Sequence, residues 1–233
     1  MKSDLKSRSK SCMPTPNSFD WTLYGDATLA GLSVLIPLPF VDSVSENFFR
    51  SRMIKSIARR HQAALEPQII NAVNHTPRNF WSRLQSCLLW PVRLVAELIL
   101  SLSRKIFYVL SIKKAVDALN HYWQRAYLLD YMIGRGYLRE GAQITPALMT
   151  LDQVLAKHST SPLNTLAREI VQSPGRLVRS VRQARRGTED KELLETQRTM
   201  RNEWSNYDEY FRRLQESYES LYQANLNTGS SHT

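Results

Sequence analysis

The sequence predicts an all-α protein, and three observations support this fold class. Hydroxyl residues precede proline at four places where helices would start: Thr76-Pro77, Thr145-Pro146, Ser161-Pro162 and Ser173-Pro174. A hydroxyl can cap the exposed N–H groups of a helix start, and proline there gives up an N–H that has no partner. Only 8 of the 233 residues are glycine, few for a sheet built from tight turns. No stretch keeps the apolar–polar alternation of a strand.

The chain is long enough for one large domain, and we expect it to be divided into four parts. These are a disordered basic tail over 1–18, a helical domain over 19–187, a long C-terminal helix over 188–226 and a disordered tail over 227–233. The first 18 residues have no apolar core, so we do not expect them to form a secretory signal peptide.

An uncharged apolar segment, Ala27–Val41, follows the first tail and is expected to form a central hairpin. It is shorter than the about 20 residues of a membrane-spanning helix, and Pro37 and Pro39 prevent one straight helix. Ala27 and Gly31 have the spacing of small residues that permits close helix contact. The segment is expected either to lie in the protein core or to dip into a membrane.

Ser43 and Glu46 have the spacing of a capping box, which predicts a helix from Ser43 to about Leu65. Its apolar face would contain Val44, Phe48, Met53, Ile57, His61 and Leu65. Its other face would carry Arg50, Arg52, Lys55, Arg59 and Arg60, and so many bases predict contact with an anionic surface.

The middle of the chain predicts several further helices. We expect a short helix from Pro67 to about Asn74, one from Pro77 to about Trp90, and a long apolar and then mixed stretch that stops at Gly134 and Gly136. Two shorter helices should lie between residues 145 and 173.

The stretch 84–112 is a second apolar element, and its part Leu84–Ser103 is long enough to span a bilayer. Arg93 and Glu97 lie near its middle, and each costs about 2.5–3.5 kcal/mol at a bilayer centre. This favours an interfacial or core helix over a span.

A basic stretch follows, in which an arginine recurs at every third residue and apolar residues occupy the opposite face. Its arginines are Arg176, Arg179, Arg182, Arg185 and Arg186. Such a basic amphipathic helix is typical of binding to an anionic membrane, where each base adds about 1 kcal/mol. Two alternatives stay open: nucleic-acid phosphates as the partner, and a solvated face paired with the acids of the next helix.

The last predicted helix, from about Glu189 to Leu226, carries a heptad seam. The seam contains Leu193, Gln197, Met200, Trp204, Tyr207, Phe211, Leu214, Tyr218, Leu221 and Asn225. It predicts a helix–helix interface, with a second copy or a partner helix binding through residues 193–225. Coiled coils prefer smaller aliphatic knobs than these aromatic rings, so docking on the protein's own core is the alternative.

The sequence contains no catalytic signature, and we expect a non-enzymatic protein without cofactor or metal. It lacks a phosphate-binding glycine loop, a nucleophile elbow and zinc-ligand spacing. Cys12 and Cys87 suggest no disulfide framework and fit a reducing compartment. If the chain were an enzyme, Asp42 and Glu46 would be its candidate acids, although helix capping explains both.

Residues 24–61 resemble part of the EcsC-like and YcjF-like bacterial families. Their sequence is YGDATLAGLSVLIPLPFVDSVSENFFRSRMIKSIARRH. The shared features are a small-residue apolar run, Pro37 and Pro39, the acid Asp42, and a helix that ends in bases. The resemblance implies a helical, membrane-associated bacterial protein, and it carries over no catalytic residue.

The formal net charge of +10 favours anionic partners. The sequence therefore predicts a peripheral membrane protein in the cytoplasm, at the inner face of a membrane, that binds an anionic surface and a protein partner. The alternative is a soluble helical scaffold or a nucleic-acid-binding protein.

Overall fold

The computed structural model describes residues 21–33, 39–74, 104–139, 143–158, 161–172, 194, 198 and 201–229. The regular elements in these ranges are all helices, which confirms the all-α fold class. They are α1 (Trp21–Leu32), α2 (Pro39–Arg60), α3 (Pro67–Asn74), α6 (Arg104–Arg135), α7 (Ile144–Lys157), α8 (Asn164–Gln172) and α11 (Asp208–Gly229). A short helical segment over 201–205 precedes α11.

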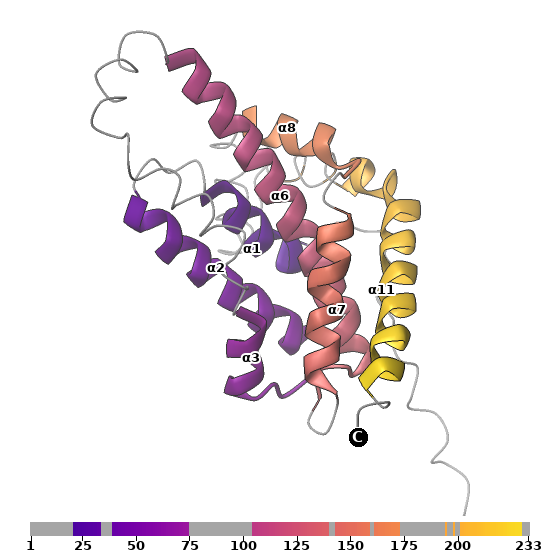
Figure 1. Ribbon diagram of the computed structural model, residues 1–233. Helices are drawn as coiled ribbons and strands as arrows, with labels where there is room; N and C mark the ends of the chain where they lie inside the picture. The colour runs from indigo at the N-terminus through magenta and orange to yellow at the C-terminus, as the bar shows by residue number, and fades with distance from the viewer. Residues whose placement is uncertain are drawn as a thin grey trace, which may run out of the picture.

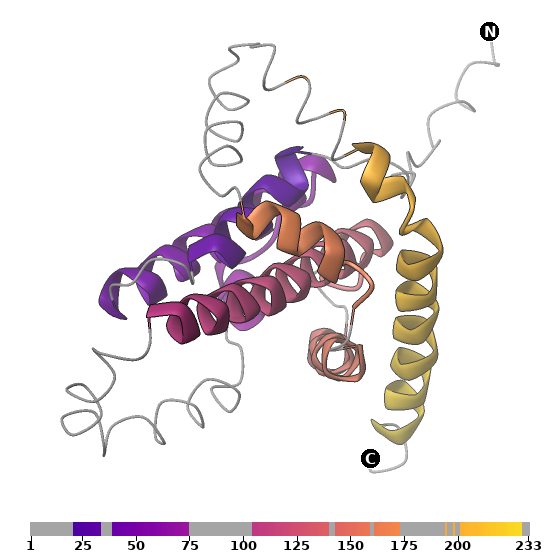
Figure 2. The ribbon, with the colours of Figure 1, turned by 90° about the horizontal axis from the view of Figure 1, so that it is seen from above.

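Helix α6 lies at the centre of the molecule, with α1 and α2 to one side and α7 and α11 to the other (Figures 1 and 2). Between residues 115 and 133, only Asp117, His121 and Tyr131 are not buried. A helix that is buried all round belongs in a core, and its polar side chains need internal partners. The other helices supply both its apolar cover and those partners.

Helix α1 packs closely on α6 through small residues. Ala27 and Ala30 are fully buried, and a Cβ added at Gly31 would lie 2.8 Å from the Cα of Leu119. The described part of the apolar segment, residues 27–33, therefore lies in the protein core. Residues 34–38 lie outside the described ranges, so the hairpin itself stays a prediction.

Helix α2 begins at Pro39 rather than at Ser43 and ends at Arg60 rather than at Leu65. Proline is suited to a helix start because its missing N–H has no partner in the first turn. Gln62 has a φ of 51°, which ends the helix in the left-handed region. The capping box predicted at Ser43 is therefore wrong, since this residue lies inside the helix.

The buried face of α2 differs in part from the prediction. Met53 and Ile57 are buried as expected, and Ile54 joins them. Phe48, however, is 58% exposed, so its placement on the apolar face is wrong. Residues three and four apart share a helix face, which groups Met53 with Ile57 but turns Phe48 to the opposite side.

The other predicted helices are confirmed where the structure describes them. The bounds of α3 agree with the prediction, α6 stops before Gly136 with its φ of +80°, and α7 and α8 are the two shorter helices. Ser161 Oγ accepts a hydrogen bond from the N–H of Leu163, 3.2 Å away, ahead of α8. At α7 the expected cap at Thr145 is wrong, because the helix already begins at Ile144. Residues 75–103 lie outside the described ranges.

The C-terminal helix is interrupted, so the prediction of one continuous helix is wrong. A turn at Asn206 and Tyr207 separates the segment 201–205 from α11. Serine, asparagine and aspartate favour turns and helix starts, and Ser205, Asn206 and Asp208 surround this break. Helix α11 extends to Gly229, so the start of the expected disordered tail is helical.

In the part of the chain that the structure describes, no helix combines the length and the hydropathy that a membrane span requires. The stretch Leu84–Ser103, considered above as a span, is not among these residues.

Candidate functional site

The strongest candidate site is the outer face of α2. Phe48, Arg52, Lys55 and Arg59 are exposed and follow each other at steps of four, three and four residues. This spacing places the four side chains on one helix face over about 16 Å, given 1.5 Å per residue. We call this row of four residues the α2 stripe. Arg60 is exposed beside its end.

The fold fixes the direction of the α2 stripe. Met53, Ile54 and Ile57 on the opposite side of the helix are at most 1% exposed and belong to the main core. Because burial of these side chains sets the rotation of α2 about its axis, the stripe must face outward. The site is therefore carried by a rigid helix and not by a loop.

The α2 stripe is basic, with one acid close to it. Residues 47–60 contain five bases and no acid. One acid approaches from α1: Asp26 Oδ2 lies 3.5 Å from Arg52 Nε, and the Asp26 side chain is only 5% exposed. This pair reduces the charge that Arg52 offers, so Lys55 and Arg59 are the better sources of positive potential on the stripe.

The exposed charges of α11, in contrast, are balanced within the helix. Arg212 pairs with Glu209 at 2.6 Å and with Glu216 at 2.5 Å, and Arg213 pairs with Glu209 at 3.0 Å. Exposed pairs like these contribute little stability, but they cancel each other's field. Among the described side chains, Lys55 and Arg59 of α2 therefore add more to the positive field than the paired bases of α11 do.

Arg50 does not belong to the exposed basic face, and its assignment to anionic-surface binding is corrected. Its side chain lies inside the protein, where Nη2 donates a hydrogen bond to the carbonyl oxygen of Asn74 at 2.8 Å. Arg125 Nη2 donates to the neighbouring carbonyl of Val73 at 2.5 Å. Both carbonyls lie at the C-terminus of α3, where positive charge is favourable. Arg50 therefore has a structural role.

The interior around these arginines is positively charged. Burial lowers the pKa of Arg125, and Arg50 lowers it further, while Asp152 opposes the shift. Burial also lowers the pKa of His121 to about 3, and Arg125 and Arg50 add to this effect. His121 is thus neutral at pH 7, which avoids a third charge in the cluster.

The described part of the heptad seam, from Trp204 onward, packs mainly inside the chain. Trp204, Phe211, Leu214 and Tyr218 are fully buried, whereas Tyr207 and Leu221 are partly buried against the same core. The ring of Trp204 lies 4.4 Å from that of Tyr24, centroid to centroid. For these residues, the arrangement agrees with the alternative in which the seam docks on the protein's own core.

Several predicted site residues lie outside the described side chains. They are Leu193, Gln197 and Met200 of the seam, and Arg176, Arg179, Arg182, Arg185 and Arg186 of the basic stretch. Asp42 and Glu46 lie within α2, but their side chains are not described either. Among the described residues, no group of three or more histidine, cysteine, aspartate or glutamate side chains gathers in a way that would hold a metal ion.

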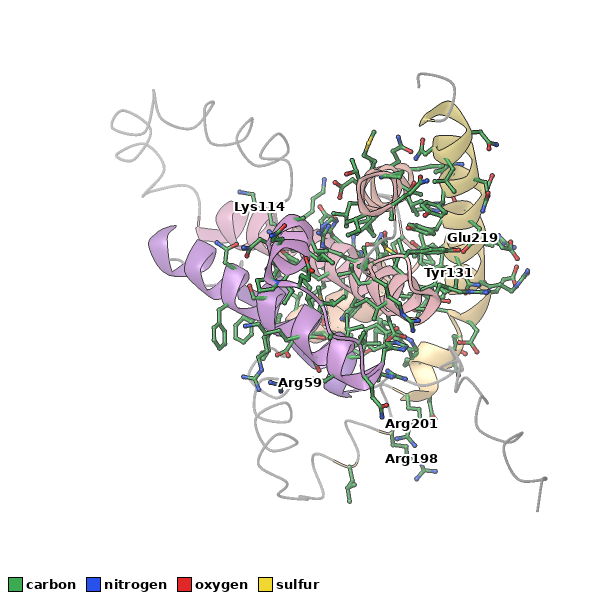
Figure 3. All side chains as sticks on the ribbon, turned by 90° about the horizontal axis from the view of Figure 1, so that it is seen from below. Arg59, Lys114, Tyr131, Arg198, Arg201 and Glu219 are labelled. Carbon is green, nitrogen blue, oxygen red and sulfur yellow. The ribbon has the colours of Figure 1, made fainter. Side chains whose placement is uncertain are left out.

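The structure also shows a cluster that sequence reasoning missed. The hydroxyls of Tyr131 and Tyr137 both donate hydrogen bonds to Glu219, and the guanidinium of Arg135 lies 5.4 Å from the centre of the Tyr131 ring. Figure 3 shows Tyr131 and Glu219 beside each other. More than 80 residues separate the tyrosines from Glu219, so no local pattern could have indicated this link between α6 and α11.

Comparison with known proteins finds no match to a protein-family model, to a curated protein or to a solved structure. The resemblance of residues 24–61 to the EcsC-like and YcjF-like families therefore stays a prediction.

Proposed function

We propose that this chain is a non-enzymatic peripheral membrane protein that binds an anionic membrane surface through the α2 stripe and Arg60. The observation that carries the proposal is an exposed aromatic ring, Phe48, in line with exposed bases on a helix segment without acids. An anionic leaflet offers phosphates to the bases and an apolar boundary to the ring.

The two kinds of contact respond differently to salt. Each base near an anionic leaflet contributes about 1 kcal/mol, and this attraction falls off within a Debye length of about 10 Å at 0.1 M salt. Insertion of Phe48 is an apolar contact that salt does not screen. Binding should therefore decrease with salt but should not disappear.

The location and the protein partner belong to the same proposal. The inner leaflet of a bacterial membrane is the anionic surface that fits the expected reducing, cytoplasmic location. A second copy or a partner helix would bind through residues 193–225. Because Trp204, Phe211, Leu214 and Tyr218 already pack in the core, such a partner would contact the other faces of this region.

The alternative partner of the α2 stripe is nucleic acid. Its binding would depend steeply on salt, because release of counterions from phosphates supplies most of the affinity. A nucleic-acid duplex also offers Phe48 no apolar layer to enter. The exposed ring therefore favours the lipid surface over the duplex.

The test is sedimentation of the full chain with neutral vesicles and with vesicles that contain an anionic phospholipid. We expect Lys55→Gln with Arg59→Gln to weaken binding to anionic vesicles about 30-fold, which corresponds to about 1 kcal/mol for each base. Lys113→Gln with Lys114→Gln is the matched control, since it removes two exposed bases elsewhere. Lys114 lies away from Arg59 in Figure 3.

Equal binding to neutral and anionic vesicles would contradict the proposal. An equal loss of binding in the α2 pair and in the control pair would contradict it as well, because the effect would then follow net charge and not the α2 stripe.

A further inference from the structure

Two exposed bases outside α2 lie on the side of the molecule that carries Arg59. Arg198 and Arg201 are exposed, and Figure 3 shows both along the edge at which Arg59 lies. Lys114 and Glu219 lie on other sides in the same view. These two arginines were not among the residues that the sequence indicated for binding.

The position of Arg201 is held by the core. Arg201 belongs to the segment 201–205, whose Trp204 is fully buried. The Trp204 ring contacts Tyr24 of α1 at 4.4 Å and Trp123 of α6 at 5.6 Å, centroid to centroid. Helix α1 in turn packs along α2. Rigid packing thus links Arg201 to the α2 stripe.

We propose that Arg198 and Arg201 form a second contact point on the same anionic bilayer, so that the protein binds in one orientation. This inference rests on the proposed function of the α2 stripe. In this orientation the bilayer contacts α2, Arg198 and Arg201 together, and the Glu219 side of α11 stays away from the lipid.

An extended bilayer fits this arrangement because it is an anionic plane that can reach two separate elements at once. When two contact points belong to one rigid body, binding of the first raises the effective concentration of the second. Glu203 lies two residues beyond Arg201 and is partly buried, so it offsets some of the added charge. We therefore expect a smaller contribution from this pair than from the two α2 bases.

The experiment compares four full-length proteins on vesicles with a fixed fraction of anionic phospholipid. They are the unchanged chain, Lys55→Gln with Arg59→Gln, Arg198→Gln with Arg201→Gln, and the control Lys113→Gln with Lys114→Gln. We expect the Arg198 and Arg201 pair to weaken vesicle binding about tenfold, and the control to leave it unchanged. All substituted side chains are exposed, so thermal unfolding should stay the same.

Backbone hydrogen exchange of the unchanged chain provides a second measurement. With vesicles present, exchange should slow in peptides that cover residues 47–60 and 198–205, but not in peptides that cover residues 209–220 of α11. Slower exchange over 209–220 would overturn the orientation.

The outcomes separate the two proposals. In one outcome, vesicle binding is lost in the variant Lys55→Gln with Arg59→Gln alone, while hydrogen exchange over 198–205 is unchanged by vesicles. This result would overturn the second contact point and leave the proposed function in place. Unchanged binding in both pairs, or equal binding to neutral vesicles, would overturn both. Displacement from the vesicles by a duplex oligonucleotide at physiological salt would assign this face to nucleic acid and would also overturn both.

Discussion

At the scale of single residues, Gly31 shows how closely the helices of this protein approach. A Cβ at this position would lie 2.8 Å from both the Cα and the Cδ2 of Leu119 on α6. The Cα cannot move without displacing the central helix. A side chain at Gly31 would therefore push α1 and α6 apart along their shared contact.

We expect Gly31→Ala to lower the free energy of unfolding by about 1–3 kcal/mol, the usual cost of overpacking. Gly134→Ala is the matched control, because the three atoms nearest its Cβ would all belong to the side-chain ring of His61, the first at 3.0 Å. The control should cost less, because a side chain can shift. Urea denaturation of both variants measures the difference, and an equal or larger loss in Gly134→Ala would contradict this explanation.

At the scale of elements, α2 has two sides with different tasks. Its inner side packs Met53, Ile54 and Ile57 into the core, and its outer side presents Phe48 and the bases to solvent. A substitution on the outer side should therefore change binding while the fold stays stable.

We expect Phe48→Ala to leave the free energy of unfolding within about 0.5 kcal/mol, since the ring is 58% exposed and its aromatic contact is with the neighbouring Phe49. It should remove most of the vesicle binding that persists at high salt, because that part is apolar. Met149→Ala, at a residue 54% exposed on α7, is the control that removes an exposed apolar side chain elsewhere. Vesicle sedimentation over a salt series measures both, and persistent high-salt binding in Phe48→Ala would count against insertion of the ring.

At the scale of the whole molecule, phenol hydroxyls help to join α11 to α6. Tyr131 and Tyr137 donate to Glu219, and Tyr127 donates to Gln215 at 3.3 Å. Burial, followed by the hydrogen bond to Glu219 and its charge, raises the pKa of Tyr131 to about 12. Burial is also the main cause that raises the pKa of Tyr127 to about 12. The folded state thus favours the protonated phenols.

A raised pKa in the folded state gives stability that is present below the unfolded pKa of about 10 and is lost as the pH rises through about 12. We expect the free energy of unfolding to fall over this window, because a phenolate cannot donate to Glu219. Tyr131→Phe should reduce the slope of the free energy of unfolding against pH, because it removes one phenol whose pKa is raised in the folded state. Denaturation at several alkaline pH values measures the free energy of unfolding of the unchanged chain and of this variant. An unchanged slope of this free energy against pH in Tyr131→Phe would contradict the role of the Tyr131 phenol.

The sequence by itself determined the features that depend on neighbouring residues. Proline and glycine act within one or two turns, so the helix from Pro67 to Asn74 and the stop of α6 before Gly136 were predictable. The absence of strand alternation predicted the helical fold class. The spacing of the bases identified those of α2 that face outward. It also placed Arg50 among them, although this side chain faces inward.

Tertiary structure alone decided which side of each element is buried. Arg50 faces inward because the carbonyls of α3 need donors, and Phe48 faces outward because Met53 and Ile57 set the rotation of α2. The aromatic seam contacts α1, α6 and α7, and Glu219 meets Tyr131 across a large separation in sequence. Periodicity shows that a helix has an apolar face, but the partner of that face depends on how the whole chain packs.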